Sequence, residues 1–191
     1  MHNFLIISKS AHTAPFIRDL KTAGRVDILL HSIISALFSS NTFREDIVLH
    51  LLLLGPPTPP RHIDIRYHEK NTISKKDLKK LLELALRKAK PGQRREVHPG
   101  VFVDDKNLET LVKEFQDDSG PIYLLDSNGI HIKEIKKENL EHAHFILGDH
   151  EGFDKQVKKF LKKECQKLSL GPQIYFTSQA ITIINYECDN V

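Results

Sequence analysis

The chain has 191 residues, of which 40% are hydrophobic and 28% are charged. These fractions are typical of an ordinary globular protein and exclude a disordered or fibrous chain. A chain of this length closes one hydrophobic core without splitting, so we expect a single domain over residues 1–191. The net charge of +3 permits a polyanionic partner but does not require one.

The cysteines and the apolar stretches bear on where the protein works. Cys165 and Cys188 lack the close spacing of metal-binding or redox pairs, and a chain of this size needs no disulfide. A reduced, cytoplasmic setting is therefore expected. The apolar stretches Phe4–Ile7 and Ile47–Leu54 are shorter than the roughly 18 residues of a membrane span. We expect no targeting segment and no membrane partner.

Short apolar runs recur along the chain and predict buried strands. Runs without polar alternation that end at Gly, Asp or Ser fit strands covered on both faces of a sheet. The runs are Phe4–Ile7, Ile47–Leu54, Val101–Val103, Ile122–Leu125, Phe145–Leu147 and Leu168–Leu170. We therefore expect an α/β domain whose mostly parallel sheet carries helices on both faces.

The segments between these runs supply the helices. Helical spacing of apolar residues is present in Val26–Phe38, Leu78–Ala89, Leu108–Phe115 and Val157–Leu161. The second of these follows the capping-box sequence Ser74-Lys75-Lys76-Asp77 and must end before Pro91. Ile174–Tyr186 mixes helical and β-branched signals, and we interpret it as a helix.

Two longer connections are predicted as loops. Gly55–Pro60 contains four prolines in six residues, Gly-Pro-Pro-Thr-Pro-Pro, so its backbone should be stiff and extended. Ala89–Gly100 is rich in Pro, Gly and basic residues. Both are expected to connect regular elements rather than to form them.

Two of the predicted strands end in turns that contain glycine. Phe145–Leu147 leads into Gly148, and Leu168–Leu170 leads into Gly171. Ligands of open α/β sheets bind at the carboxyl ends of strands, and a glycine lets a cofactor approach the backbone closely. The alternative is a plain strand-to-helix turn. There is no GxGxxG and no P-loop pattern, which disfavours dinucleotide and nucleoside triphosphate binding.

A group of histidines and carboxylates raises a second possibility. It comprises His142, His144, Asp149, His150 and Glu151, and His142 and His144 would share one face of a strand, as paired metal ligands must. A third ligand with a defined environment is not evident, so solvated or capping histidines are the favoured interpretation and no metal site is expected.

Basic residues gather in one region, at Lys75, Lys76, Lys79, Lys80, Arg87, Lys88, Lys90, Arg94 and Arg95. Lysines opposite an apolar helix stripe usually mark a solvated face. The run continues into a loop at Arg94 and Arg95, which favours phosphate contact. Near the N-terminus, Asp27 stands beside Arg25, and it either interacts with a helix dipole or orients a substrate.

Several stretches together resemble the archaeal TrmY family, the tRNA pseudouridine-54 N1-methyltransferases of the knotted SPOUT class. They are Ala23–Leu29, Phe43–Val48, Gly55–Pro60, Ile146–His150, Leu168–Pro172 and Phe176–Ile184. Each stretch alone is short, but their order and spacing span nearly the whole chain. The resemblance implies a C-terminal deep trefoil knot, a homodimer and tRNA as the partner.

The resemblance also implies S-adenosyl-L-methionine as the cofactor. By position, the residues that contact it would be Leu125, Gly148, Leu168, Ser169, Leu170, Gly171, Pro172, Gln173 and Ala180. Ala180 stands where the family commonly has Cys. Since N1 of pseudouridine is itself a nucleophile, a covalent role for that Cys is not needed, and Ala180 would form a wall of the pocket.

Methyl transfer leaves the N1 proton to be removed or oriented, and Asp27 is the first candidate for this task, with Asp46 behind it. Arg25, Arg44, Arg94 and Arg95 are the candidates for RNA contact. Three alternatives stay open: a non-catalytic RNA-binding protein with this fold, a methyltransferase acting on ribosomal RNA pseudouridine, and a metal-dependent hydrolase built on His142–Glu151.

Overall fold

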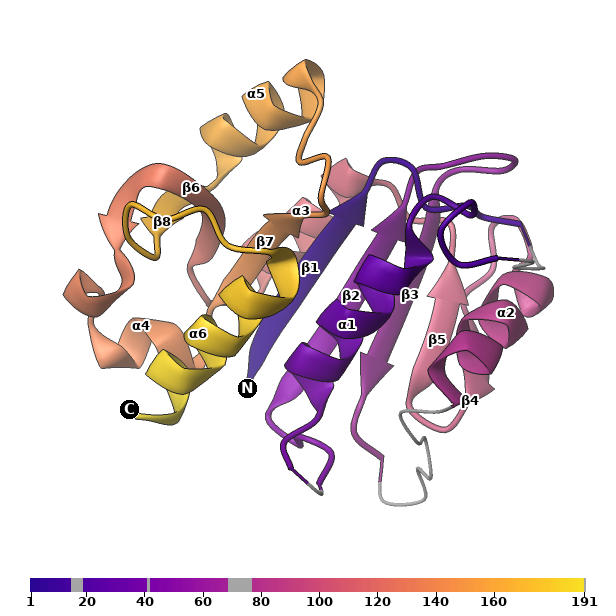
Figure 1. The fold of residues 1–191 in the computed structure, drawn as a ribbon, viewed down its shortest axis with the longest axis horizontal. Coiled ribbons are helices and arrows are strands. Elements are labelled where there is room, and N and C mark those ends of the chain that lie inside the picture. The colour runs from indigo at the N-terminus through magenta and orange to yellow at the C-terminus, as the bar shows by residue number, and fades with distance from the viewer. Residues whose placement is uncertain (15–18, 41, 69–76, 191) are drawn as a thin grey trace.

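The computed structural model describes residues 1–14, 19–40, 42–68 and 77–190 (Figure 1). Strands and helices alternate along the chain. They are β1 (His2–Ser8), α1 (Val26–Leu37), β2 (Ile47–Leu53), β3 (Arg61–Arg66), α2 (Leu78–Lys88), β4 (Arg95–His98), β5 (Val101–Asp104), α3 (Leu108–Asp117), β6 (Ile122–His131), α4 (Lys137–Glu141), β7 (His144–Gly148), α5 (Lys155–Glu164), β8 (Gln166–Ser169) and α6 (Thr177–Asp189), with a 3₁₀ turn, η2, at Ile132–Glu134.

The strands form one eight-stranded sheet in the order β4-β5-β3-β2-β1-β7-β6-β8. The half that contains β2, β1, β7, β6 and β8 is parallel throughout. The pairings of β2 with β3, β3 with β5 and β4 with β5 are antiparallel. The α/β class is thus confirmed, but the sheet is mixed, with a parallel half and an antiparallel half.

Two strands were missed by the sequence prediction, and both lie in the antiparallel half. In β3, Ile63 and Ile65 enter the core on one face, while His62 and Asp64 are buried on the other. Buried charged and imidazole groups hide the apolar signal of a strand. The predicted loop Ala89–Gly100 likewise contains β4, whose residues are mostly polar.

The proline-rich segment Gly55–Pro60 connects β2 to the antiparallel β3, so it reverses the direction of the chain instead of extending it. Thr13 fixes it from the side: its hydroxyl donates to the Gly55 carbonyl at 3.0 Å, and the Thr58 backbone N–H donates to the Thr13 hydroxyl oxygen at 2.8 Å. The capping-box residues Ser74, Lys75 and Lys76 lie outside the described residues.

Helices cover both faces of the sheet, as predicted (Figure 1). One core cluster joins α1, α2 and α6 to residues of β1, β2, β3, β5 and β7 on the near face of the figure. A second cluster joins α3 and α5 to the opposite face, through Leu5, Leu52, Ile146 and their neighbours. Among the described helices, none is both long and apolar enough to cross a membrane.

The C-terminal part differs from its prediction in one informative way. The predicted helix Ile174–Tyr186 begins only at Thr177, because residues 170–176 form the connection from β8 to α6. The Gln179 side chain accepts a hydrogen bond from the Phe176 backbone N–H at 3.0 Å and starts the helix there. Ile174 and Phe176 are consequently exposed, at 94% and 71%.

Candidate functional site

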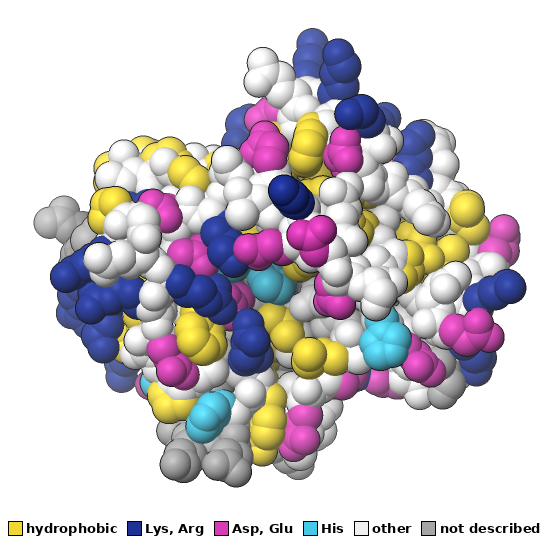
Figure 2. All heavy atoms as spheres, turned by 180° about the vertical axis from the view of Figure 1, so that it is seen from behind, with side chains coloured by type: hydrophobic (Ala, Val, Ile, Leu, Met, Phe, Trp, Pro, Cys, Tyr) yellow, Lys and Arg dark blue, Asp and Glu magenta, His cyan; other side chains and the backbone are white. Residues whose placement is uncertain are grey.

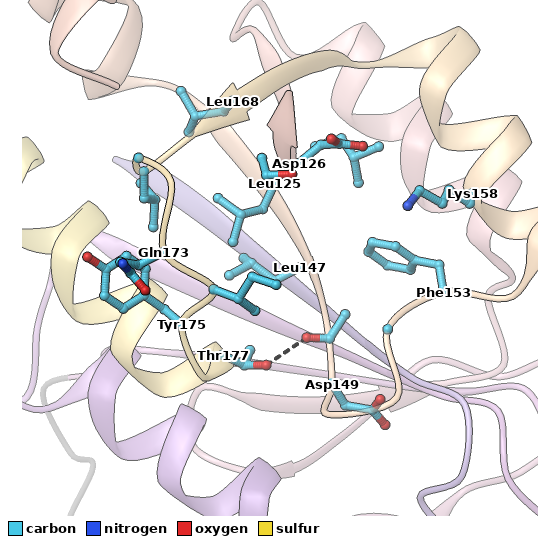
Figure 3. Close-up of a pocket in the computed structure, with 17 residues that line it drawn as sticks. Leu125, Asp126, Leu147, Asp149, Phe153, Lys158, Leu168, Gln173, Tyr175 and Thr177 are labelled. Atoms are coloured by element: carbon cyan, nitrogen blue, oxygen red, sulfur yellow. Dashed lines mark hydrogen bonds between the residues drawn. The ribbon is translucent and has the colours of Figure 1, made fainter. Parts of the chain in front are cut away.

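A cavity of about 310 Å³ lies at the carboxyl ends of β6, β7 and β8 and at the start of α6 (Figure 3). This volume is within the range of roughly 300–1,000 Å³ found for small-molecule sites. Its lining residues are Leu124, Leu125, Asp126, Ser127, Leu147, Gly148, Asp149, Gly152, Phe153, Lys158, Leu168, Leu170, Gly171, Gln173, Ile174, Tyr175 and Thr177. The site is therefore built by three parallel strands and the loops that follow them, where ligands of such sheets bind.

One wall of the cavity is apolar. Leucines from three different strand ends, Leu125, Leu147 and Leu168, line the cavity, and Figure 3 shows the Phe153 ring across from Leu125 and Leu147. Leu168 and Leu147 are almost entirely buried, at 0% and 1% exposure. Since these side chains belong to the packed core, the wall is rigid and suits a flat apolar ligand surface.

The polar side of the cavity is held by hydrogen bonds between elements. The Thr177 hydroxyl donates to the Gly148 carbonyl at 2.7 Å and ties α6 to β7 (dashed in Figure 3). The Ser8 hydroxyl donates to Asp149 Oδ2 at 2.6 Å, and the Glu151 backbone N–H donates to Asp149 Oδ1 at 2.9 Å. The carboxylate of Asp149 is fixed, so the turn after β7 is preorganised.

Glycine is required at the turn after β7. A Cβ atom on Gly148 would lie 2.9 Å from the Gly152 Cα, which is closer than real Cβ contacts allow. After β8, Gly171 adopts φ of 114°, a conformation that other residues rarely adopt. The Gly171 backbone N–H also donates to the Ser169 hydroxyl at 3.1 Å. Both turns named from the sequence thus have a structural need for glycine and line one cavity.

The structure brings most of the predicted cofactor residues together. Leu125, Gly148, Leu168, Leu170, Gly171 and Gln173 line the cavity. Ser169 and Pro172 stand between lining residues, and the Ser169 hydroxyl is used for the turn. Ala180 is completely buried in the core cluster of α1 and α6. It does not line the cavity, so it does not form the wall of the pocket that was expected from the sequence.

Several lining residues were not predicted. Asp126 and Ser127 directly follow the predicted strand Ile122–Leu125, and polar residues at a strand end could have been selected on that signal. Lys158 and Thr177 come from helices whose packing against the turns depends on the tertiary fold. No local pattern in the sequence indicates them.

Asp27 and Arg25 form an exposed pair at the start of α1. Arg25 Nε and Nη2 each donate to an Asp27 carboxylate oxygen at 3.0 Å. The hydrogen bond from Arg25 lowers the pKa of Asp27, so its carboxylate is ionised at neutral pH. The turn before α1 packs on the loop after β1, since a Cβ on Gly24 would lie 1.8 Å from the Ser10 carbonyl oxygen. The pair therefore lies at the same edge of the sheet as the cavity, although neither residue lines it.

Asp46 and Arg44 lie at the edge of the sheet opposite the cavity. Asp46 precedes the first residue of β2, at the amino edge of the parallel half, whereas the cavity is at the carboxyl edge. Arg44 donates to Asp46 at 3.1 Å and also pairs with Asp189 at the end of α6. The hydrogen bonds that Arg44 donates to Asp189 and to Asp46 raise the pKa of Arg44. Within this chain, the structure gives this group a stabilising role and does not bring it to the cavity.

Arg94 and Arg95 lie at the far antiparallel flank. Arg94 Nη1 is 2.6 Å from Asp64 Oδ2 and 3.0 Å from Asp104 Oδ2, and its guanidinium stacks 4.5 Å from the centre of the Phe102 ring. These ion pairs neutralise much of its charge. Arg95 donates to the Lys88 carbonyl at the end of α2.

The predicted group of histidines and carboxylates does not converge. His142 follows α4 as its C-cap residue, whereas His144 is buried in β7 and its ring stacks on Phe115 with the ring centres 4.4 Å apart. Among the described residues, the group with metal-ligand spacing is instead His50, His62 and Asp64. Two arginines hold Asp64, however, and they would oppose a bound cation.

This buried group is better explained as a hydrogen-bonded chain. The rings of His50 and His62 are joined at 3.0 Å, and His62 Nδ1 donates to Asp104 Oδ1 at 2.9 Å. Burial lowers the pKa of His50 well below its usual value, so its ring is neutral at neutral pH. The hydrogen bonds of this group of side chains satisfy polar groups beneath α3 and leave no position for a ligand.

Comparison with solved structures places this arrangement in a known fold. The crystal structure of Archaeoglobus fulgidus Nep1 bound to S-adenosylhomocysteine matches with a TM-score of 0.71 at 14% identity, over 98% of this chain and 97% of that chain. At this identity the likeness shows the fold alone.

The family follows from the sequence comparisons. A family model described as "Putative SAM-dependent RNA methyltransferase" matches residues 1–191. The tRNA (pseudouridine(54)-N(1))-methyltransferase of Methanococcoides burtonii is 36% identical over 195 residues, which cover 99% of this chain and 96% of the relative. The enzyme of the same name from Pyrococcus abyssi is 32% identical over 100% of this chain and 98% of the relative. The chain belongs to this family of RNA methyltransferases, and the resemblance predicted from its motifs is confirmed.

Proposed function

We propose that this chain transfers a methyl group from S-adenosylmethionine to N1 of pseudouridine 54 in tRNA. The relatives that match it over nearly their whole length carry this activity in their names. The observation that carries the proposal in the structure is the cavity built by the Gly148 and Gly171 turns. It joins an apolar slot to fixed polar groups at the carboxyl edge of the sheet.

The cavity residues fit the chemistry of S-adenosylmethionine. The leucine wall of Leu125, Leu147 and Leu168 suits the adenine ring, and the Asp126 carboxylate and Ser127 hydroxyl suit ribose hydroxyls. The backbone of the Gly148 and Gly171 turns supplies donors and acceptors at close range. When bound, the cofactor supplies a methyl group activated by its sulfonium.

Asp27 acts on the acceptor nucleotide in this proposal. Because the hydrogen bond from Arg25 lowers the pKa of Asp27, its carboxylate is a weak base. It therefore orients the N1–H of pseudouridine by accepting a hydrogen bond and stabilises the positive charge that N1 gains as it bonds to the methyl group and S-adenosylhomocysteine leaves. The N1 proton then passes to the carboxylate and from there to water. Arg25 holds Asp27 and faces the RNA. We do not assign Asp46 or Arg44 a part, since both lie at the other edge of the sheet.

The trefoil knot is part of the proposal. Both Leu125 and Ile130 of β6 pair with Leu168 of β8, so residues 126–129 loop out of the strand around this position. A Cβ on Gly129 would lie 2.5 Å from the Leu168 backbone, so the loop packs closely against β8. Residues 170–176 then return from the edge strand β8 to α6, which packs against α1. This path supports a threaded C-terminal segment.

A homodimer is likewise proposed, with α6 and the loop before it as the contact. Ile174, Phe176 and Tyr186 are exposed at 94%, 71% and 64%, which is unusual for large apolar side chains close together in the sequence. Covering them with a second copy would place that copy beside the cavity, so the RNA would contact both subunits. The cytoplasmic location expected from the sequence stays a prediction, as does the single domain.

One set of incubations tests the proposed activity. The protein is mixed with S-adenosylmethionine labelled in its methyl group and with one of three RNAs: tRNA carrying pseudouridine 54, the same tRNA carrying uridine 54, or a ribosomal RNA stem-loop carrying pseudouridine. Label should enter the first RNA only. Label in the ribosomal stem-loop alone would move the substrate to ribosomal RNA. Binding without label in any RNA would favour a non-catalytic RNA-binding protein.

A further inference from the structure

Four basic side chains gather at the flank of the molecule farthest from the cavity. We call them the flank patch: Arg87 and Lys88 at the end of α2, Lys90 in the following turn, and Arg95 at the start of β4. Arg87, Lys88 and Lys90 are exposed. Figure 2 shows Lys and Arg side chains crowded along the flank where α2 and β4 lie, on the left of that view.

These charges are not balanced by nearby carboxylates. Within the described part of the chain, Arg87, Lys88, Lys90 and Arg95 have no carboxylate oxygen within 4.0 Å. Two neighbouring cations do have a carboxylate oxygen within 4.0 Å, since Lys79 pairs with Glu83 and Arg94 pairs with Asp64. A cluster of unpaired cations creates a positive potential that attracts a polyanion.

Helix capping accounts for only part of this arrangement. Basic residues in the last turn of α2 interact favourably with the helix dipole, and Arg95 donates to the Lys88 carbonyl. Lys90, however, lies beyond the helix in a short turn closed by the bridge between Lys90 and Gln93. The patch extends past the helix terminus, where the dipole effect has already fallen away.

The position of the patch limits what it can contact. β4 and β6 are six strand steps apart in the sheet, and neighbouring strands lie about 4.8 Å apart, so patch and cavity in one subunit are separated by roughly 30 Å. A nucleotide in the cavity cannot touch the patch. A large folded RNA can reach both.

We propose that the flank patch binds the phosphate backbone of tRNA at a place outside the modified loop. This inference rests on the proposed function for its RNA, and it adds a second contact region that increases affinity without reading sequence. The sequence predicted that Arg94 would bind RNA. In this proposal, the unpaired cations of the flank patch bind the RNA instead.

The test compares two triple variants of the full chain with equal loss of charge. The first is Arg87→Gln with Lys88→Gln and Lys90→Gln. The matched control is Lys113→Gln with Lys133→Gln and Lys136→Gln, three exposed lysines far from the patch in the sequence. The dissociation constant for unmodified tRNA transcript is measured from low to high salt without cofactor, after thermal melts have shown that both variants are folded.

The patch variant should weaken tRNA binding roughly tenfold and reduce the slope of log affinity against log salt by about 2–3, since each lost phosphate contact contributes about 0.7–0.9. The control should keep the slope of the unaltered protein. In methyl transfer, the patch variant should raise KM with kcat retained.

An unchanged slope in the patch variant, or an equal loss in the control, would overturn the proposal. So would an equal loss of affinity for an isolated stem-loop carrying the modified loop, because that RNA lacks the remote contact. The unaltered protein could transfer no methyl group while the patch variant still has a smaller slope of log affinity against log salt. That result would refute the proposed activity and support the proposed role of the flank patch.

Discussion

Gly148→Val is the substitution that most sharply tests the cavity. A Cβ at this position would lie 2.9 Å from the Gly152 Cα and 3.1 Å from its carbonyl carbon, and both are backbone atoms that cannot rotate away. The intervening turn is anchored, since Asp149 accepts from the Ser8 hydroxyl at 2.6 Å and from the Glu151 N–H. The strain of such overpacking is typically about 1–3 kcal/mol.

Relief of this strain must move Gly152 and Gly148, and both line the cavity. If about 3 kcal/mol is lost from binding, affinity falls roughly 100-fold. Calorimetric titration with S-adenosylmethionine and with S-adenosylhomocysteine should therefore give a dissociation constant at least tenfold higher in Gly148→Val. Gly92→Ala is the control: Gly92 has positive φ of 68° and no atom within 4 Å of a new Cβ, so it should lose stability without losing cofactor affinity. Binding by Gly148→Val within twofold of the unaltered protein would refute the cavity assignment.

Three further predictions concern ionisable groups. Asp27→Asn should lower kcat at least roughly 100-fold, because the carboxylate is needed at the acceptor, and leave the cofactor dissociation constant unchanged; full activity would remove Asp27 from the mechanism. Burial raises the pKa of Asp104, but its bonds to His62 and Arg94 outweigh this and lower the pKa to about 2. Its stabilisation is therefore present above the unfolded pKa near 3.9 and is lost as the pH falls toward 2, so Asp104→Asn should cost about 2 kcal/mol in urea unfolding at pH 7 and much less near pH 2; an equal cost at both pH values would contradict this. Burial also raises the pKa of the Cys165 and Cys188 thiols to about 12, so both should react slowly with a thiol reagent at pH 8, and rapid labelling of either would show that burial to be wrong.

The parallel half of the fold could be predicted from the sequence because its signals are local. Runs such as Phe4–Ile7 and Phe145–Leu147 are apolar throughout, since strands covered on both faces have no solvent side. In the antiparallel half, β5 was predicted from the run Val101–Val103, but β3 and β4 could not be predicted in the same way. In β3, His62 is buried in a hydrogen-bonded chain with His50 and Asp104, and Asp64 is buried against Arg66 and Arg94. This pattern resembles a polar loop until those partners are known.

The candidate site shows the same difference between residues that local signals indicate and residues whose place depends on distant contacts. Gly148 and Gly171 were selected because each follows an apolar run, and the structure places both turns in one cavity. Asp27 and Asp46 were the first and second candidates from the sequence, and they lie at opposite edges of the sheet. The edge a residue reaches depends on strand direction and order, which are set by contacts distant in the sequence. The helix residues Lys158 and Thr177 were missed for this reason.

The central claim is that this chain methylates N1 of pseudouridine 54 in tRNA. The most direct measurement is to treat tRNA carrying that pseudouridine with the protein and S-adenosylmethionine bearing a deuterated methyl group, digest the RNA with nucleases, and locate the added mass by mass spectrometry. The account predicts one deuterated methyl group, on the base of nucleotide 54, and none when the protein carries Gly148→Val. A methyl group at any other nucleotide or on a ribose, or unmodified RNA after saturating incubation, would contradict it.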